Sequence, residues 1–186
     1  VVLIGGKKPK SILFCREKHE EREIWDGYRY GPKAAKTAFG FDAAYPIEQL
    51  DEKLVELMGN QPALFYPIGS SSVWDARIIK SRETVKAKAR TGIQAPNAIC
   101  DVRELLNGMR LFKDEHELGI MRDAAKISCE AHRRAMRFTR PGQYEYEVEA
   151  ELLHEFCRHG ASHPAYTSIV AGGTNACTLH YVGNDA

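Results

Sequence analysis

Residues 46–88 read PIEQLDEKLVELMGNQPALFYPIGSSSVWDARIIKSRETVKAK and decide the fold class. Apolar side chains recur at helical spacing in the first part of this stretch, which predicts a helix that ends at Gly59. The run ALFYPI from Ala63 predicts a buried strand, and the serines after Gly69 can cap a second helix that reaches about Lys88. Alternating strands and helices are typical of an α/β protein with a mixed α+β layer, which is the fold class that we expect.

The residues before this stretch predict a hairpin followed by a loop. Val1–Ile4 and Ser11–Arg16 are short apolar runs joined by GGKKPK, whose glycines and proline suit a turn. Residues 17–33 are polar and aromatic and contain glycine and proline, so we expect a loop there. Because the chain both begins and ends in strand-like runs, whereas natural termini are usually polar and frayed, we expect an excised piece of a longer protein.

A domain boundary is expected near residue 111, after a stretch in which glycine, proline and asparagine interrupt the pattern. The chain carries 18 basic and 14 acidic residues up to this point, and 8 basic and 11 acidic residues beyond it. Asp114 and Glu117 then have the spacing of a capping box, which predicts the start of a helix. We therefore expect an N-terminal α/β domain at residues 1–111 and a second domain at residues 112–186.

A second helix is predicted in this region from about Tyr144 to His159, and its glutamates are most simply explained as a solvated face. Two strand-like runs follow, Thr167–Ala171 and Cys177–Val182, and the loop GGTNA between them suits a hairpin. Alternation along the second run would let His180 project into a site, although a lone histidine in a strand is more often structural than catalytic. The glutamates are Glu145, Glu147, Glu149 and Glu151.

Composition excludes several classes of protein. Hydrophobic residues make up 44% of the chain and the net charge is +1, so no overall field recruits nucleic acid or an anionic membrane. The apolar runs are far shorter than the ~20 residues of a spanning helix, and no signal-peptide pattern opens the chain. Five cysteines without a CxxC pair predict reduced, mostly buried thiols. We therefore expect a cytoplasmic protein that binds neither nucleic acid nor a membrane.

Two partial motifs are rejected. The stretch from His154 to His159 nearly spells the HExxH zinc motif, but Arg158 occupies the position of the second ligand. Gly172-Gly173-Thr174 lacks the lysine of a phosphate-binding loop and joins two predicted strands instead of opening a helix.

Several segments resemble one known family. They are MRLFKDEHE at 109–117, Arg140-Pro141-Gly142 with Tyr144-Glu145, Glu155-Phe156, Arg158-His159-Gly160-Ala161, Pro164, Tyr166, Ile169-Val170 and Leu179-His180-Tyr181, with Ile24-Trp25-Asp26-Gly27 upstream. In their order and spacing, along nearly the whole chain, these segments are similar to aminopeptidase P, the bacterial-type Xaa-Pro aminopeptidase. The creatinase and prolidase relatives of that family share its plan less closely.

This resemblance implies a partial N-terminal α/β domain of creatinase type, without its early strands, followed by the first part of a pita-bread catalytic domain. It implies hydrolysis of the bond between an N-terminal residue and a following proline, with two divalent ions, usually Mn²⁺, held by two Asp, one His and two Glu. None of these ligands has a counterpart in this chain, so we expect them downstream of Ala186 and expect the chain alone to be inactive. The implied partners are peptides with proline at the second position and further copies of the chain in a homo-oligomer.

The resemblance also implies site residues. His180 matches an active-site histidine that hydrogen-bonds the substrate or the developing oxyanion, and Tyr166 matches a tyrosine that borders the metal centre. Arg90 falls where the family has a substrate-contacting arginine, and Trp25 where it has a tryptophan that reaches a neighbouring subunit's site. A surface arginine and an interface or core tryptophan are equal alternatives for these two. Two other functions stay open: a non-catalytic peptide-binding or chaperone-like module of the same architecture, and a prolidase-type dipeptidase.

Overall fold

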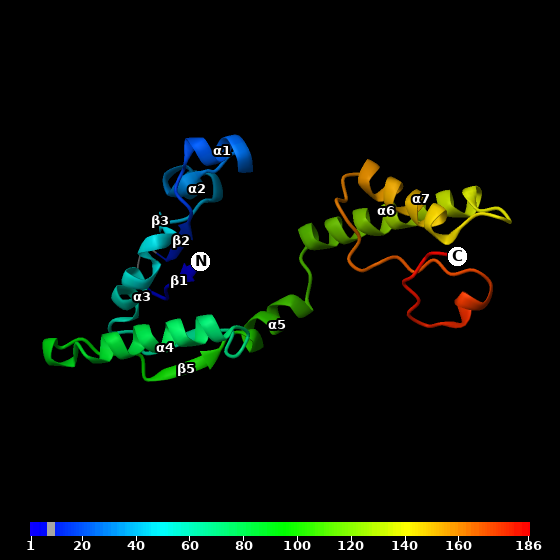
Figure 1. The fold of residues 1–186 in the computed structure, drawn as a ribbon. Coiled ribbons are helices and arrows are strands. Elements are labelled where there is room, and N and C mark those ends of the chain that lie inside the picture. The colour runs from blue at the N-terminus through cyan, green and yellow to red at the C-terminus, as the bar shows by residue number, and fades with distance from the viewer. Residues whose placement is uncertain (7–9) are drawn as a thin grey trace. The chain divides into compact units, whose positions relative to one another are not determined.

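The structure is a computed structural model that describes residues 1–6 and 10–186. The chain divides into two compact units, Val1–Met109 and Arg110–Ala186. In Figure 1 the first unit runs from blue to green, and the second from green to red. Each unit is described separately below.

The first unit begins with a three-stranded sheet in the order β1-β2-β3. Its strands are β1 (Val2–Leu3), β2 (Ser11–Cys15) and β3 (Ala43–Pro46). β1 runs antiparallel to β2, so the predicted hairpin is confirmed, although residues 7–9 of its connection lie outside the described residues. β3 pairs in parallel with β2 and was not predicted.

The segment between β2 and β3 is helical, so the loop predicted at residues 17–33 is wrong. Helix α1 (Glu20–Asp26) is capped by the His19 side chain, and its first turn is acidic, as the helix dipole favours. Helix α2 (Gly31–Phe39) has a proline in its first turn and ends at Gly40, whose φ of 72° is left-handed. Glycine and proline therefore mark the ends of helices in this segment.

Residues 46–88, whose pattern predicts the fold class, form the expected elements. A 3₁₀ turn leads into α3 (Leu50–Met58), which is followed by β4 (Ala63–Tyr66) and α4 (Ser72–Lys86). Ser71 caps α4, because its hydroxyl accepts a hydrogen bond from the backbone N–H of Trp74 at 3.4 Å. The two predicted helices and the strand between them are confirmed.

Two further elements complete this part of the chain. β5 (Ala98–Asp101) pairs in parallel with β4, although the glycine, proline and asparagine residues around it predict no strand there. Helix α5 (Arg103–Leu111) follows and contains the division between the two units.

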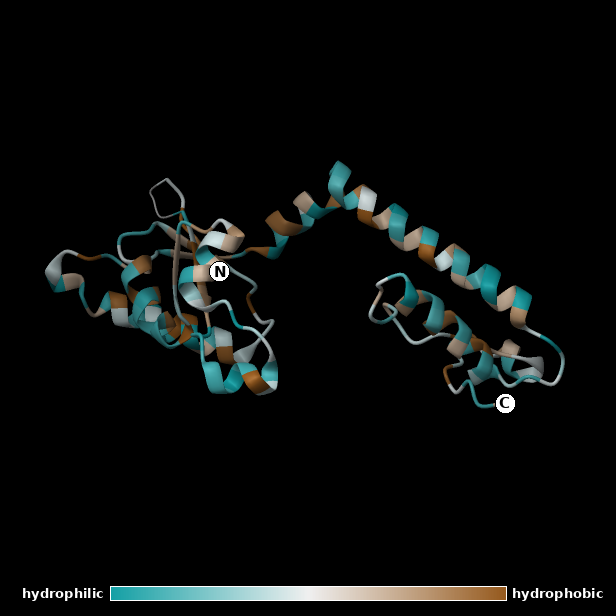
Figure 2. Ribbon diagram, turned by 90° about the horizontal axis from the view of Figure 1, so that it is seen from above, coloured by the Kyte–Doolittle hydropathy of each residue, from teal (hydrophilic) through white to brown (hydrophobic). Residues whose placement is uncertain are grey.

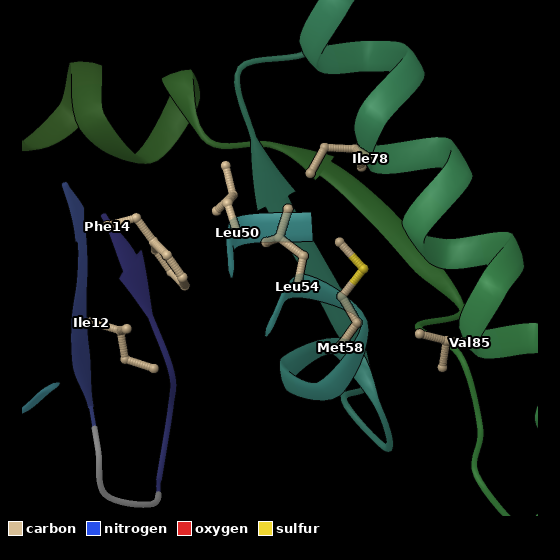
Figure 3. Close-up of a cluster of buried hydrophobic side chains, with 7 residues drawn as sticks. All are labelled: Ile12, Phe14, Leu50, Leu54, Met58, Ile78 and Val85. Atoms are coloured by element: carbon tan, nitrogen blue, oxygen red, sulfur yellow. The ribbon is translucent and has the colours of Figure 1, made fainter. Parts of the chain in front are cut away.

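The apolar core of the first unit brings together one strand and two helices (Figure 3). β2 contributes every second side chain, and α3 contributes one face at spacings of four residues, so both elements present apolar groups to the same interior. The buried side chains are Ile12, Phe14, Leu50, Leu54, Met58, Ile78 and Val85.

The second unit is a helical hairpin followed by an irregular segment. α6 (Glu115–Phe138) packs against α7 (Glu145–Arg158), and Figure 2 shows polar and apolar stretches alternating along the long helix α6. The predicted capping box of α6 is confirmed, with both hydrogen bonds between Asp114 and Glu117 at 2.8 Å. Ala131 is fully buried, which lets the helix backbones approach closely.

Residues 159–186, all of which are described, contain no strand, so the hairpin predicted at 167–182 is wrong. A 3₁₀ helix at Gly173–Cys177 occupies the predicted loop. The physical reason is that hydrogen bonds to side chains, above all those of Glu145 and Asn184, hold this segment where a strand would need a partner strand.

Candidate functional site

The first residue of α7, Glu145, is the centre of a buried polar cluster. One carboxylate oxygen, Oε1, accepts hydrogen bonds from the backbone N–H of Gly172 at 2.7 Å and from the side chain of Asn175 at 3.0 Å. The other, Oε2, accepts from the Tyr181 hydroxyl at 2.7 Å and from the backbone N–H of Ala186 at 3.2 Å. Glu145 also donates its own backbone N–H to the Ala186 carbonyl at 2.7 Å.

This cluster corrects the prediction of a solvated glutamate face. Only 6% of Glu145 is exposed. Burial alone would raise the pKa of Glu145, but the hydrogen bonds from its four donors lower it to about 2. The Glu145 carboxylate in turn raises the pKa of Tyr181 to about 12, and burial acts in the same direction. Glu145 therefore stays ionised, and Tyr181 stays protonated, over the whole neutral range.

Next to this cluster, the side chain of Asn184 makes a second set of hydrogen bonds, which we call the Asn184 clamp. Its side-chain oxygen accepts from the backbone N–H of Val170 at 3.0 Å, and its amide nitrogen donates to the carbonyl of Ser168 at 2.9 Å. Asn184 is 3% exposed and has a φ of 51°, in the left-handed region that asparagine tolerates better than most residues. The Asn184 side chain thus takes the hydrogen bonds that a neighbouring strand would otherwise provide.

A third group of polar side chains joins the two helices of this unit. Arg134 of α6 pairs with Glu151 and, at 3.4 Å, with Glu155, and Glu155 also lies 2.9 Å from the imidazole of His159. Burial would raise the pKa of Glu155, but the contact with His159 and the nearby arginines lower it. These residues explain the near-motif at 154–159 as a structural contact between helices.

The residues singled out by the resemblance are exposed. In the first unit, Trp25 lies in α1 with 86% of its surface exposed, and Arg90 lies in the 3₁₀ turn after α4. In the second unit, Tyr166 is 79% exposed and His180 is also exposed. Within the described residues, none of these four side chains takes part in a hydrogen bond, ion pair or ring contact. Their roles stay predictions.

Two hollows are described on the surface of residues 1–6 and 10–186, and neither includes these residues. One, of about 390 Å³, lies between α3 and α4. Another of similar volume lies between β2 and α2. Neither contains Trp25, Arg90, Tyr166 or His180.

The described part of the chain offers neither a metal cluster nor a spanning helix. No group of three or more His, Cys, Asp or Glu side chains in residues 1–6 and 10–186 is arranged to hold a metal ion. Across the same residues, each helix is too short or too polar to cross a bilayer. Cys15 and Cys100 are half-buried whereas Cys129, Cys157 and Cys177 are exposed, so the expectation of mostly buried thiols is wrong.

Comparison with known proteins decides the family. Residues 1–66 match the family described as aminopeptidase P, N-terminal domain, and residues 119–186 match metallopeptidase family M24. The chain is 37% identical to the Xaa-Pro aminopeptidase of Escherichia coli (strain K12) over 175 residues, which cover 94% of this chain and 40% of that protein. The chain belongs to the aminopeptidase P family. The predicted resemblance is thereby confirmed.

Solved structures of the aminopeptidase P family share this fold. The chain superposes on Pseudomonas aeruginosa aminopeptidase PepP with a TM-score of 0.95 and 44% identity, covering 99% of this chain and 42% of that one. For proline aminopeptidase P II from Yersinia pestis the TM-score is 0.89 and the identity 40%. The predicted fold class is confirmed: a mixed α/β chain with an aminopeptidase P N-terminal domain followed by the first part of an M24 pita-bread domain. The chain spans about 40% of the length of the relatives it matches.

Sequence reasoning missed the two residues that organise the second unit. Glu145 lies within the Arg140-Pro141-Gly142 and Tyr144-Glu145 segment that carries the family resemblance, so that segment held a usable signal. For Asn184, the signal is weaker: an asparagine after Gly183 is typical of a turn, and nothing local reveals its burial.

Proposed function

We propose that the protein containing this chain is an Xaa-Pro aminopeptidase, which releases the N-terminal residue of a peptide whose second residue is proline. The observation that carries the proposal is that both parts of the chain match, in order, the N-terminal domain and the M24 region of relatives with that name. The same relatives support the proposal that it is a metallo-aminopeptidase, a hydrolase. Residues 1–111 and 112–186 are the proposed domains.

His180 is the proposed catalytic residue of this chain. Its imidazole is exposed and has no partner among the described residues, so it is free to hydrogen-bond a substrate carbonyl or the oxyanion that develops from it. Tyr166, equally free, is proposed to border the metal centre. The M24 family consists of metallopeptidases, and Mn²⁺ is the proposed metal. We propose that the metal ligands lie beyond Ala186, in the part of the relatives that this chain does not cover, and that the chain alone is inactive.

Further proposals concern substrate, assembly and location. Arg90 is proposed to contact the substrate peptide, and Trp25 to reach a neighbouring subunit in a homo-oligomer. Exposed apolar side chains surround Trp25 in sequence, including Ile24 and Tyr28, which supports a contact with another chain. Five free cysteines support a reducing compartment and therefore the cytoplasm.

The test is peptide hydrolysis by the whole protein with Mn²⁺. An Xaa-Pro-Yaa tripeptide should be cleaved after its first residue, and His180→Ala should lower kcat/KM by about 10²–10³, the usual effect of losing one oxyanion-stabilising donor. His154→Ala is the matched control, because His154 is an exposed histidine of α7 that makes no hydrogen bond or ion pair with any residue that the structure describes. Wild-type activity of His180→Ala would exclude the role assigned to it.

The same assay separates the two alternative functions. Cleavage of Xaa-Pro dipeptides but not of tripeptides would indicate a prolidase-type dipeptidase. Binding of the tripeptide without any turnover would indicate a non-catalytic peptide-binding or chaperone-like module.

A further inference from the structure

The segment that carries His180 is closed into a small loop by its own side chains. Asn175 donates to the Tyr181 hydroxyl at 3.1 Å, and this bond joins the two sides of the loop in which His180 lies. The backbone N–H of Thr178 donates to the Asn175 carbonyl at 2.9 Å, which tightens the loop from inside. His180 is thus the immediate neighbour of one end of this closure.

Both ends of the closed loop are attached to Glu145. Asn175 and Tyr181 each donate to its carboxylate, one to each oxygen, and Glu145 lies 30 and 36 positions away from them in the chain. The attachment point is the first residue of α7, a helix that packs on α6. The loop is therefore fixed to the helical hairpin through one buried side chain.

Among the described residues, the His180 side chain has no hydrogen bond or ion pair of its own that would fix its position. Its side chain is exposed and makes no hydrogen bond or ion pair among the described residues. The position of its imidazole is consequently set by the backbone on either side, and that backbone is held by Glu145.

We propose that Glu145 is a positioning residue for the reaction: its buried carboxylate holds the loop from Asn175 to Tyr181 so that His180 is presented in one place. This inference rests on the proposed function of His180. Glu145 itself does not touch substrate, since its two oxygens are occupied by four donors.

The role requires a carboxylate, and an amide of the same shape cannot replace it. Each oxygen of Glu145 receives one backbone N–H, from Gly172 at Oε1 and from Ala186 at Oε2. In Glu145→Gln, either orientation of the amide therefore turns an NH₂ group toward a backbone N–H, and two donors face each other. The loop must then move away from the start of α7.

The test combines hydrogen–deuterium exchange with kinetics on the whole protein. In Glu145→Gln, peptides that cover residues 167–186 should exchange at least tenfold faster, whereas peptides from α6 should exchange as in the wild type. Because a displacement of about 1 Å can cost about 10²-fold in rate, kcat should fall tenfold to a hundredfold while KM stays within twofold. Glu149→Gln is the matched control: Glu149 is on the same helix, and its side chain makes no hydrogen bond or ion pair in the described part of the chain.

Besides unchanged exchange at 167–186 in Glu145→Gln, three results would overturn the proposal. The first is a wild-type kcat in Glu145→Gln, and the second is an equal effect of Glu149→Gln. If the Glu145 variant unfolds, which faster exchange of α6 would show, Tyr181→Phe decides, because it removes one hydroxyl from the cluster. Tyr181→Phe should speed exchange in 167–186 and lower kcat, and wild-type values for it are the third overturning result.

Failure of the proposed function is distinguishable from failure of this inference. A wild-type protein that cleaves no Xaa-Pro peptide would exclude the aminopeptidase activity. The exchange experiment needs no activity, so unchanged exchange at 167–186 in Glu145→Gln would still exclude the role of Glu145 in holding the loop, and faster exchange would support it.

Discussion

Each of the two units of the chain is stabilised internally by a different kind of buried side chain. In the described part of the first unit, the buried residues are almost all apolar, and Ser81 is the polar exception. In the second unit, Ala131 is the buried hydrophobic residue, and three buried residues are polar or charged: Glu145, Glu155 and Asn184.

The kind of buried side chain sets the conditions of pH under which each unit is stable. Burial of apolar surface is non-directional and does not change with protonation, whereas a buried carboxylate stabilises a fold only while it is ionised and hydrogen-bonded. The second unit should therefore be sensitive to pH and to single polar substitutions. Both tryptophans, Trp25 and Trp74, lie in the first unit, so tryptophan fluorescence reports on that unit alone.

Acid should affect the two units most unequally. The pKa of Glu145 is about 2 in the folded chain and ordinarily 4.5, so its contribution to stability is complete above pH 4.5 and is lost as the pH falls through about 2. The pKa of Glu155 is shifted in the same direction. By NMR, the amides of Gly172 and Ala186 should lose protection from exchange in this range before the amides of β2 do. Simultaneous loss in both units would contradict the comparison.

A cavity in the apolar core should be the most damaging single substitution. Leu54 is 5% exposed and lies within the core cluster, so Leu54→Ala should lower the free energy of unfolding by about 2–5 kcal/mol. The measurement is urea unfolding followed by tryptophan fluorescence. Ile24→Ala is the control, because Ile24 is 81% exposed and its loss should cost less than about 0.5 kcal/mol. A similar cost for both variants would show that the cluster is not the core.

Loss of the Asn184 clamp should have an intermediate effect on the second unit. Asn184→Ala leaves the N–H of Val170 and the carbonyl of Ser168 without their partner, at a cost of about 1–3 kcal/mol in local stability. Protection of the Val170 amide, measured by NMR hydrogen exchange, should fall accordingly. Asn184→Gly removes the same hydrogen bonds but adopts the φ of 51° easily, so any smaller loss in this variant measures the backbone contribution. Unchanged protection in both variants would contradict the role of the side chain.

Helix caps should give the smallest effects and compare the two units directly. Asp114→Ala at the start of α6 should cost about 1 kcal/mol, because it removes a capping box with hydrogen bonds of 2.8 Å. Ser71→Ala at the start of α4 should cost less, because its single capping bond is 3.4 Å long. Amide exchange in the first turn of each helix measures both, and a larger loss for Ser71→Ala would reverse this order.

Much of the fold could be predicted from local patterns. The helices α3, α4, α6 and α7 follow from apolar periodicity and capping residues, and these signals lie within the helix that they specify. Capping and periodicity apply to α1 and α2 as well. Their glycines and proline suggest a loop, but in the structure these residues stand at the ends of the helices. The strands β3 and β5 have only four residues each, too few to show a period.

For the candidate site too, some features can be predicted from the sequence and others are seen only in the structure. Motifs along the chain predict the family and single out His180 as the residue to test, because a motif depends on residue type and spacing alone. Only the tertiary structure shows that Glu145 is buried and that the Asn184 side chain makes the hydrogen bonds that a neighbouring strand would otherwise provide. The donors to Glu145 come from positions 27 to 41 residues away, and no local pattern of charge or hydrophobicity records contacts over that separation.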